Sequence, residues 1–210
     1  MKHSLWALVT LGALSAPAFA AFDPPPVFVD APSQELQPPP ADKAQIVFLE
    51  PVNKVQGYFP VGIYELKGDA RTLLAITGAQ TKTVLLVDPG QHRFMSTNVL
   101  TKVHFLDANV EAGKRYYVLV RFIYNEGFQL RPIRPTGPSD FSMAGADWPT
   151  WVAGSPRNVV KAPLGDEEFA KPKPVKRIDK AYAKAVEAWN KKTDAEKAEL
   201  TLTPADAAPL

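Results

Sequence analysis

The chain has 210 residues, a formal charge of +2 at pH 7 and no cysteine. Its length suits one domain with extensions, and its near-neutral charge argues against a nucleic-acid binder, which would be far more basic. The absence of cysteine excludes disulfides, thiol catalysis and thiolate metal sites. The 21 prolines are about twice the usual share of roughly 5%, so we expect the proline-rich regions to lack long regular elements.

Residues 1–20 have the pattern of a signal peptide. Lys2 supplies a positive start, and an apolar run at residues 5–14 is too short to span a bilayer. The small-x-small sequence Ala18-Phe19-Ala20 then predicts cleavage between Ala20 and Ala21. The alternative, an uncleaved membrane anchor, lacks a charged stop after the apolar run. We therefore expect a periplasmic or secreted mature protein.

Residues 21–42 form a proline-rich linker. The triplets Pro24-Pro25-Pro26 and Pro38-Pro39-Pro40 favour extended, semi-rigid polyproline II structure. A spacer is the favoured interpretation, and a docking peptide is the alternative.

Residues 43–134 carry the pattern of a β-sandwich domain. Runs rich in β-branched and aromatic residues alternate with Gly, Asn and Asp turn signals at roughly 8–12-residue intervals. No long helical period interrupts them, which argues against a parallel α/β sheet. We predict a mainly β fold, an immunoglobulin-like antiparallel β-sandwich of about 7–8 strands with a C-terminal helical extension. The expected strands are Ala44–Glu50, Tyr58–Lys67, Thr72–Thr77, Thr83–Val87, His92–Thr97, Lys102–Val110, Arg115–Ile123 and Phe128–Ile133.

Two features of these strands predict burial. The run Val84–Val87 is apolar at every position, which is typical of a central strand covered on both faces. In the strand that follows Gly113, alternation separates a core face from a wetter face that contains Arg121. The expected core face is Tyr116, Val118, Val120 and Phe122, and the wetter face is Tyr117, Leu119, Arg121 and Ile123.

The stretch Val103–Arg121 is expected to form a hairpin, because two β-rich runs flank a short connection with one glycine. Within it, Val110, Ala112, Gly113 and Tyr116 have the spacing of a tyrosine corner. In that device a tyrosine hydroxyl bonds back to the backbone a few residues upstream. We therefore assign structural roles to Tyr116 and Gly113, and to Gly90 in the Asp-Pro-Gly turn before it.

Residues 135–170 show no clear period and contain Trp148-Pro149-Thr150-Trp151. Exposed Trp148 and Trp151 could stack on sugar rings or anchor a partner, whereas buried rings would hold this wrapping segment on the sandwich, the interpretation that we favour. The acids Asp166-Glu167-Glu168 could serve a hydrolase. Their place before a helical segment favours a helix N-terminus instead.

Residues 171–202 are predicted to form the C-terminal helices, followed by a tail at residues 203–210. The stripe Ile178, Tyr182, Ala185, Val186 and Trp189 should dock on the sandwich, with Trp189 buried. The opposite, lysine-rich face could touch anionic lipid, although docking of the stripe explains the helix more simply. A capping box at Thr193–Glu196 predicts a second, short helix.

No arrangement of residues predicts an enzyme, a metal or a cofactor. His92 and His104 remain after cleavage, but a metal site usually needs a third ligand and an oriented second shell. His92 is instead expected beside a turn, and His104 on a wet face. No serine-hydrolase elbow, zinc-protease pair or phosphate loop occurs.

Three motifs together resemble a family of exported bacterial domains of unknown function. They are Asp88-Pro89-Gly90-Gln91-His92, Glu111-Ala112-Gly113-Lys114-Arg115-Tyr116-Tyr117-Val118 and Gly127-Phe128-Gln129-Leu130-Arg131-Pro132, and residues 195–202 are similar to the family's closing helix. The resemblance covers about residues 43–134 and 175–202. It implies a small β-sandwich of the surface-layer or peptidase-regulatory kind without a catalytic residue. Many relatives are lipoproteins, a feature that does not carry over because the lipid-bearing cysteine is absent.

These observations predict a non-enzymatic envelope protein that binds or braces another envelope protein or a glycan. The alternatives are glycan or small-ligand binding at Trp148 and Trp151, and an uncharacterised hydrolase.

Overall fold

The computed structural model describes residues 28–30, 33, 35–51, 59–98, 102–137, 139–156, 158–160 and 171–210. The expected leader with its cleavage site, much of the proline-rich linker and Asp166-Glu167-Glu168 lie outside these residues. Within them, no helix is both long and apolar enough to cross a membrane.

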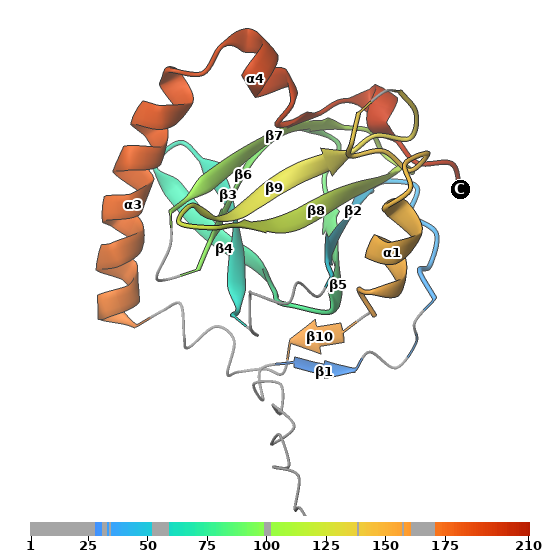
Figure 1. Ribbon diagram of the computed structural model, residues 1–210, viewed down its shortest axis with the longest axis horizontal. Coiled ribbons are helices and arrows are strands. Elements are labelled where there is room, and N and C mark those ends of the chain that lie inside the picture. The colour runs from blue at the N-terminus through green and yellow to red at the C-terminus, as the bar shows by residue number, and fades with distance from the viewer. Residues whose placement is uncertain are drawn as a thin grey trace, which may run out of the picture.

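Two mixed sheets pack face to face as a sandwich (Figure 1). The four-stranded sheet has the order β5-β2-β8-β9, and the five-stranded sheet has the order β11-β7-β6-β3-β4. A separate pair, β1 with β10, lies at one end of the sandwich. The strands are β1 (Phe28–Asp30), β2 (Ala44–Glu50), β3 (Val61–Lys67), β4 (Ala70–Thr77), β5 (Thr81–Val87), β6 (Gly90–Thr97), β7 (His104–Val110), β8 (Arg115–Ile123), β9 (Gly127–Ile133), β10 (Asn158–Val160) and β11 (Thr201–Leu202).

The main core lies between the two sheets. Alternate side chains of β8 point into it, so Tyr116, Val118 and Val120 are buried against Phe48 of β2 and Phe94 of β6. The mainly β sandwich and the core face of the strand after Gly113 are therefore confirmed.

The prediction of a wholly antiparallel sandwich is wrong. β2 pairs with β8 in parallel, and β11 pairs with β7 in parallel. Between β2 and β8 the chain crosses to the five-stranded sheet and comes back, so a long stretch of chain separates the two paired strands. That long connection permits a parallel pairing, whereas a two-residue turn would not.

The predicted hairpin at Val103–Arg121 is also wrong. β7 pairs with β6 and β11, whereas β8 pairs with β2 and β9, so these two strands belong to different sheets. The connection at residues 111–114 is thus a corner that carries the chain from one sheet to the other. Both a hairpin and a corner need a short turn with glycine, and the local sequence does not distinguish them.

The stretch Val84–Val87 is not a central strand, because the interior strands of the four-stranded sheet are β2 and β8. β5 lies at the edge of the sheet, and its Leu86 is 49% exposed. Every residue of β2 is buried, because its second face packs beneath the segment that contains Trp148. The same cover buries Leu119, so the face expected to be wetter is dry at that position.

The helices are α1 (Trp148–Ala153), α3 (Pro172–Asn190), α4 (Asp194–Ala198) and a 3₁₀ turn, η1 (Pro204–Asp206). α1 gives regular structure to a segment for which the sequence showed no period. The capping box of α4 is present, with reciprocal bonds between Thr193 and Glu196. Arg134 fastens the C-terminal region through Asp206 and the carbonyl oxygen of Thr201.

Helix α3 docks beside the five-stranded sheet through its apolar stripe. Trp189 is 5% exposed, and its ring meets that of Phe105 edge-on at 5.8 Å between centroids. Arg93 lies over the same indole at 5.2 Å, and Arg71 forms an ion pair with Asp179. The predicted burial of Trp189 against the sandwich is therefore confirmed.

Candidate functional site

Trp148 and Trp151 lie on α1, which covers the outer face of the four-stranded sheet. Both side chains are half-buried. The Trp148 ring meets Tyr117 edge-on at 5.0 Å, and the Trp151 ring stacks on Phe141 at 6.1 Å. This is the packing arrangement that we favoured from the sequence. It leaves the two indoles engaged with the protein's own aromatic rings.

The three structural residues of the corner and the preceding turn have the expected geometry. The Tyr116 hydroxyl accepts a hydrogen bond from the backbone N–H of Glu111 at 3.0 Å, which is the bond that defines a tyrosine corner. Gly113 has φ +70° and Gly90 has φ +122°, values that L-residues with side chains rarely adopt. These residues have a structural role in the sandwich and do not form a binding or catalytic site.

His92 lies in β6 close to the turn, as expected, and its partly buried ring also contacts a carboxylate. Its Nδ1 lies 2.6 Å from a Glu65 carboxylate oxygen, and its Nε2 lies 2.8 Å from the Asp88 carbonyl oxygen. Burial would raise the pKa of Glu65, but hydrogen bonds from His92 and Lys67 outweigh burial and lower it.

The two histidines do not combine into a metal site. They lie on neighbouring strands, but His92 is opposite Ala108 and His104 is opposite Ser96. In the described part of the chain, no three His, Cys, Asp or Glu side chains gather closely enough to hold a metal ion.

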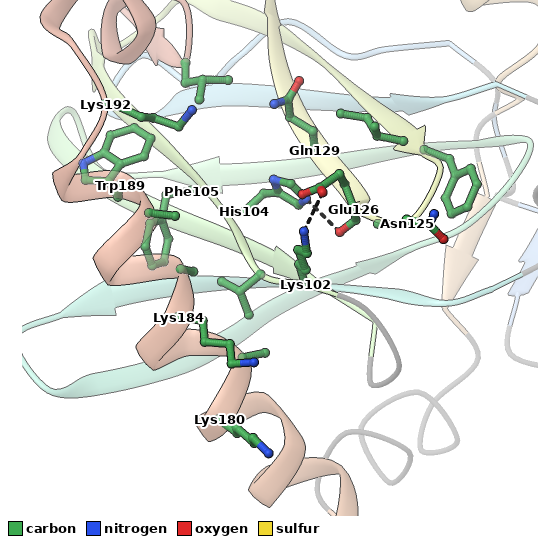
Figure 2. A pocket seen from close by; sticks show the side chains of 18 of the residues that line it. Lys102, His104, Phe105, Asn125, Glu126, Gln129, Lys180, Lys184, Trp189 and Lys192 are labelled. Carbon is green, nitrogen blue, oxygen red and sulfur yellow. Dashed lines mark hydrogen bonds and ion pairs between the residues drawn. The ribbon is translucent and has the colours of Figure 1, made fainter.

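The feature that the structure assembles is a groove between α3 and the turn that joins β8 to β9 (Figure 2). The tip of the β8–β9 hairpin points toward α3 in Figure 1, and the space between them has a volume of about 1160 Å³. Apolar side chains form its floor, and basic side chains of α3 form its rim. The apolar lining comprises Val103, Phe105, Phe122, Ile123, Ala181, Ala185, Ala188, Trp189 and Leu200.

Helix geometry explains the basic rim. Arg177, Lys180 and Lys184 follow one another at steps of three and four residues, so they lie on one face of α3. Lys192 lies two residues after the end of the helix, and Lys102 lines the groove from the strand side. Figure 2 shows the side chains of Lys180, Lys184 and Lys192 extending into the space beside the helix.

The charge of the groove is strongly positive. Among its described lining residues there are five lysine or arginine side chains and one carboxylate, that of Glu126. Lys102 donates to this carboxylate at 2.5 Å. The four basic residues on the helix side form no ion pair with any described residue. The described lining of the groove therefore carries a clear excess of positive charge.

His104 lies at the bottom of the groove but has no catalytic partner there. Its Nε2 donates to the carbonyl oxygen of Glu126 at 3.0 Å, while the Glu126 carboxylate bonds Lys102 instead (Figure 2). Burial lowers the pKa of His104, so the neutral imidazole is favoured. The described lining contains no serine, threonine or cysteine that this imidazole could activate.

The sequence identified the lysines of this groove but not the groove. The basic face of residues 171–192 was apparent from helical spacing, yet nothing local showed which strands it would face. The turn at Asn125-Glu126-Gly127 marked a bend between strands and carried no sign of its position beside α3. Exposed Tyr124, at 75%, is the one residue there whose large ring at a hairpin tip could have suggested a contact surface.

No protein-family model matches the chain, and no curated protein is similar enough to it to be detected. The function is therefore inferred from the geometry and charge of the groove.

Proposed function

We propose that the protein is an exported cell-envelope component that acts without catalysis, as a binding module, and that the groove between α3 and the β8–β9 turn is its binding site. The observation that carries this proposal is the groove's combination of an apolar floor with a basic rim. Ligand sites in proteins are concave, mostly apolar and edged by a few polar groups that orient the ligand.

Export is proposed from the sequence of residues 1–20. A positive start, a short apolar run and a small-x-small site together favour cleavage after Ala20 and release beyond the cytoplasmic membrane. The absence of cysteine suits an oxidising compartment equally well, because no thiol is exposed to it.

The absence of catalysis is proposed from the groove's chemistry. An enzyme site needs a nucleophile or base in hydrogen-bond reach of an orienting partner. His104 is held by a backbone oxygen, and Glu126 is neutralised by Lys102. The hydrolase alternative would depend on Asp166-Glu167-Glu168, which lie outside the described residues.

Glycan binding at Trp148 and Trp151 is the weaker candidate. Sugar stacking needs an exposed ring face. Here Phe141 stacks on one face of Trp151, and Tyr117 contacts Trp148 edge-on.

The strand order bears on the kind of β-sandwich. We propose a sandwich of the peptidase-regulatory kind within the exported family that the motifs resemble. The seven-strand immunoglobulin order places its first, second, fourth and fifth strands in one sheet. Here β2 and β5 share one sheet, whereas β3 and β6 share the other. That division departs from the immunoglobulin order, which leaves the peptidase-regulatory kind of sandwich as the proposal.

Two experiments test the proposed function. N-terminal sequencing of protein from a periplasmic fraction should give Ala21 first, and an intact Met1 in the cytoplasm would contradict export. For binding, a photo-crosslinking amino acid at Tyr124, beside the groove, should capture one discrete envelope component in living cells. The same amino acid at Leu86, an exposed residue of edge strand β5, is the control. Equal capture at both positions, or none at Tyr124, would contradict the groove as the binding site.

A further inference from the structure

We infer that the groove binds a lipid-like anion as a single molecule, with a phosphate headgroup on the cations of α3 and a hydrocarbon chain along the apolar floor. The inference rests on the proposed function, because it names the class of ligand for the same groove.

The headgroup position follows from the charges of the rim. Arg177, Lys180, Lys184 and Lys192 line one side of the groove over about 20 Å at 1.5 Å per residue. None of the four forms an ion pair with a described carboxylate, although the charge of Lys192 acts on Glu196, so a bound anion would gain charge-assisted hydrogen bonds without first breaking an ion pair. Phosphate suits such a rim because its oxygens can accept from several lysines at once.

The chain position follows from the floor. Phe105 and Trp189 line the groove on the side of α3, and Ile123 lines it from the β8–β9 hairpin. On the helix side the floor is made of Ala181, Ala185 and Ala188, whose small side chains keep the space open. Phe105 and Trp189 are only 4% and 5% exposed. The apolar surface that a hydrocarbon chain would cover, and an inorganic anion would not, therefore belongs to more exposed lining residues such as Tyr124 and Ala188.

The size of the groove favours a long ligand. Pockets for drug-sized molecules occupy roughly 300–1000 Å³, and this groove has a volume of about 1160 Å³. A compact metabolite would fill only part of it.

The way in which α3 is docked argues against a different lipid contact, insertion of the helix into a membrane surface. Such helices bury a free apolar face among the lipids. Here Ile178 and Trp189 are each 5% exposed and pack on the sandwich instead. Val175, at 39%, is the one large hydrophobic residue among the described side chains of α3 that is exposed, so the helix offers a membrane little apolar surface, and we place the lipid chain in the groove itself.

Glu126 gives the site a built-in competitor for the headgroup. It is the only carboxylate among the described lining residues, and it holds Lys102 at 2.5 Å. The Glu126 carboxylate would repel a phosphate held on the α3 cations across the groove, and it keeps Lys102 from that phosphate. Glu126→Gln should therefore strengthen binding, which a site for a neutral or cationic ligand would not do.

Calorimetric titration with dodecyl phosphate, below its micelle concentration, tests the inference. Inorganic phosphate supplies the charge alone, and dodecyl maltoside supplies the chain with a neutral headgroup. Dodecyl phosphate should bind at least about tenfold more tightly than either, because only it satisfies both the rim and the floor. Equal binding of either comparator, or no binding of dodecyl phosphate, would overturn the ligand class.

Variants test the place of binding. Lys180→Gln with Lys184→Gln should weaken dodecyl phosphate binding by about tenfold, since two charge contacts are lost. The matched control is Lys176→Gln with Lys191→Gln, which removes the same charge from exposed positions that do not line the groove. Equal weakening by both pairs would mean a general charge effect and overturn the site. Thermal melts of each variant establish that it is folded.

Two further outcomes separate this inference from the proposed function. Sedimentation with phosphatidylglycerol vesicles, without binding of the dodecyl phosphate monomer, would indicate a membrane-surface contact and overturn the inference. Capture of a protein or glycan at Tyr124 without dodecyl phosphate binding would keep the groove as the binding site but refute a lipid-like ligand.

Discussion

Removal of one hydroxyl from the corner tests how much the tyrosine corner stabilises the sandwich. Tyr116 is completely buried, and its hydroxyl accepts the N–H of Glu111 at 3.0 Å. Tyr116→Phe keeps the ring and creates no large cavity, so the cost is that of a backbone donor left without its acceptor. Such a loss costs about 1–3 kcal/mol. Because Glu111 is exposed and water can reach part of its backbone, we expect about 1–2 kcal/mol.

The assay is urea unfolding followed by tryptophan fluorescence, with the free energy of unfolding extrapolated to water. For a domain of this size, the melting temperature should fall by about 2–8 °C. Tyr117→Phe is the matched control on the same strand, because its hydroxyl forms no hydrogen bond with the described residues and its ring contact with Trp148 survives. If Tyr116→Phe changes stability by less than about 0.5 kcal/mol, or no more than the control, the corner does not stabilise the fold.

Two further substitutions address the helix and the buried carboxyl. Trp189→Ala should cost about 3–5 kcal/mol in urea unfolding, because it removes a ring that packs on Phe105 and Arg93; an unchanged melting temperature would mean that α3 does not dock. Glu50 is wholly buried, and burial raises its pKa well above 4.5 despite a hydrogen bond with Thr77. The folded protein therefore keeps a proton that the unfolded chain releases, and stability falls as the pH rises above the unfolded value. Glu50→Gln has no carboxyl group to ionise, so it should not lose this stability. The difference in the free energy of unfolding, variant minus native, should therefore increase between about pH 5 and about pH 8. Parallel pH profiles in urea unfolding would contradict the raised pKa.

The features that could be predicted from the sequence are those formed by residues close together in the chain. The bounds of β2 and β8 agree with the expected strands, and the connections on either side of β8 are short, at residues 111–114 and 124–126. The capping box at Thr193 and the corner at Tyr116 each depend on residues within five positions of one another. Such devices are complete within one stretch of sequence, and their chemistry does not depend on the rest of the fold.

Features that depend on pairing between distant segments were not predictable. The apolar run in β5 resembles that of a central strand. β5 is nevertheless an edge strand, because it pairs only with β2, whose other side pairs in parallel with β8. The burial of Leu119 requires the cover that comes from the Trp148 segment. The groove likewise joins Lys102 and the β8–β9 turn to residues of α3, which follow them in the chain by more than fifty positions. Helical spacing showed that the cations share one face of α3. Only the fold shows that this face lies beside the β8–β9 turn.

The measurement that tests the central claim most directly is protection of the groove inside the cell. The native chain has no cysteine, so a single introduced thiol reports one position. Ala188→Cys places it in the groove, and Ala183→Cys places it on an exposed part of α3 outside the groove. With a maleimide that does not cross the cytoplasmic membrane, the Ala183→Cys thiol should react equally in cells and in purified protein. The Ala188→Cys thiol should react more slowly in cells, where the bound envelope component covers it. Equal reactivity of the Ala188→Cys thiol in both settings would show an empty groove and contradict the account.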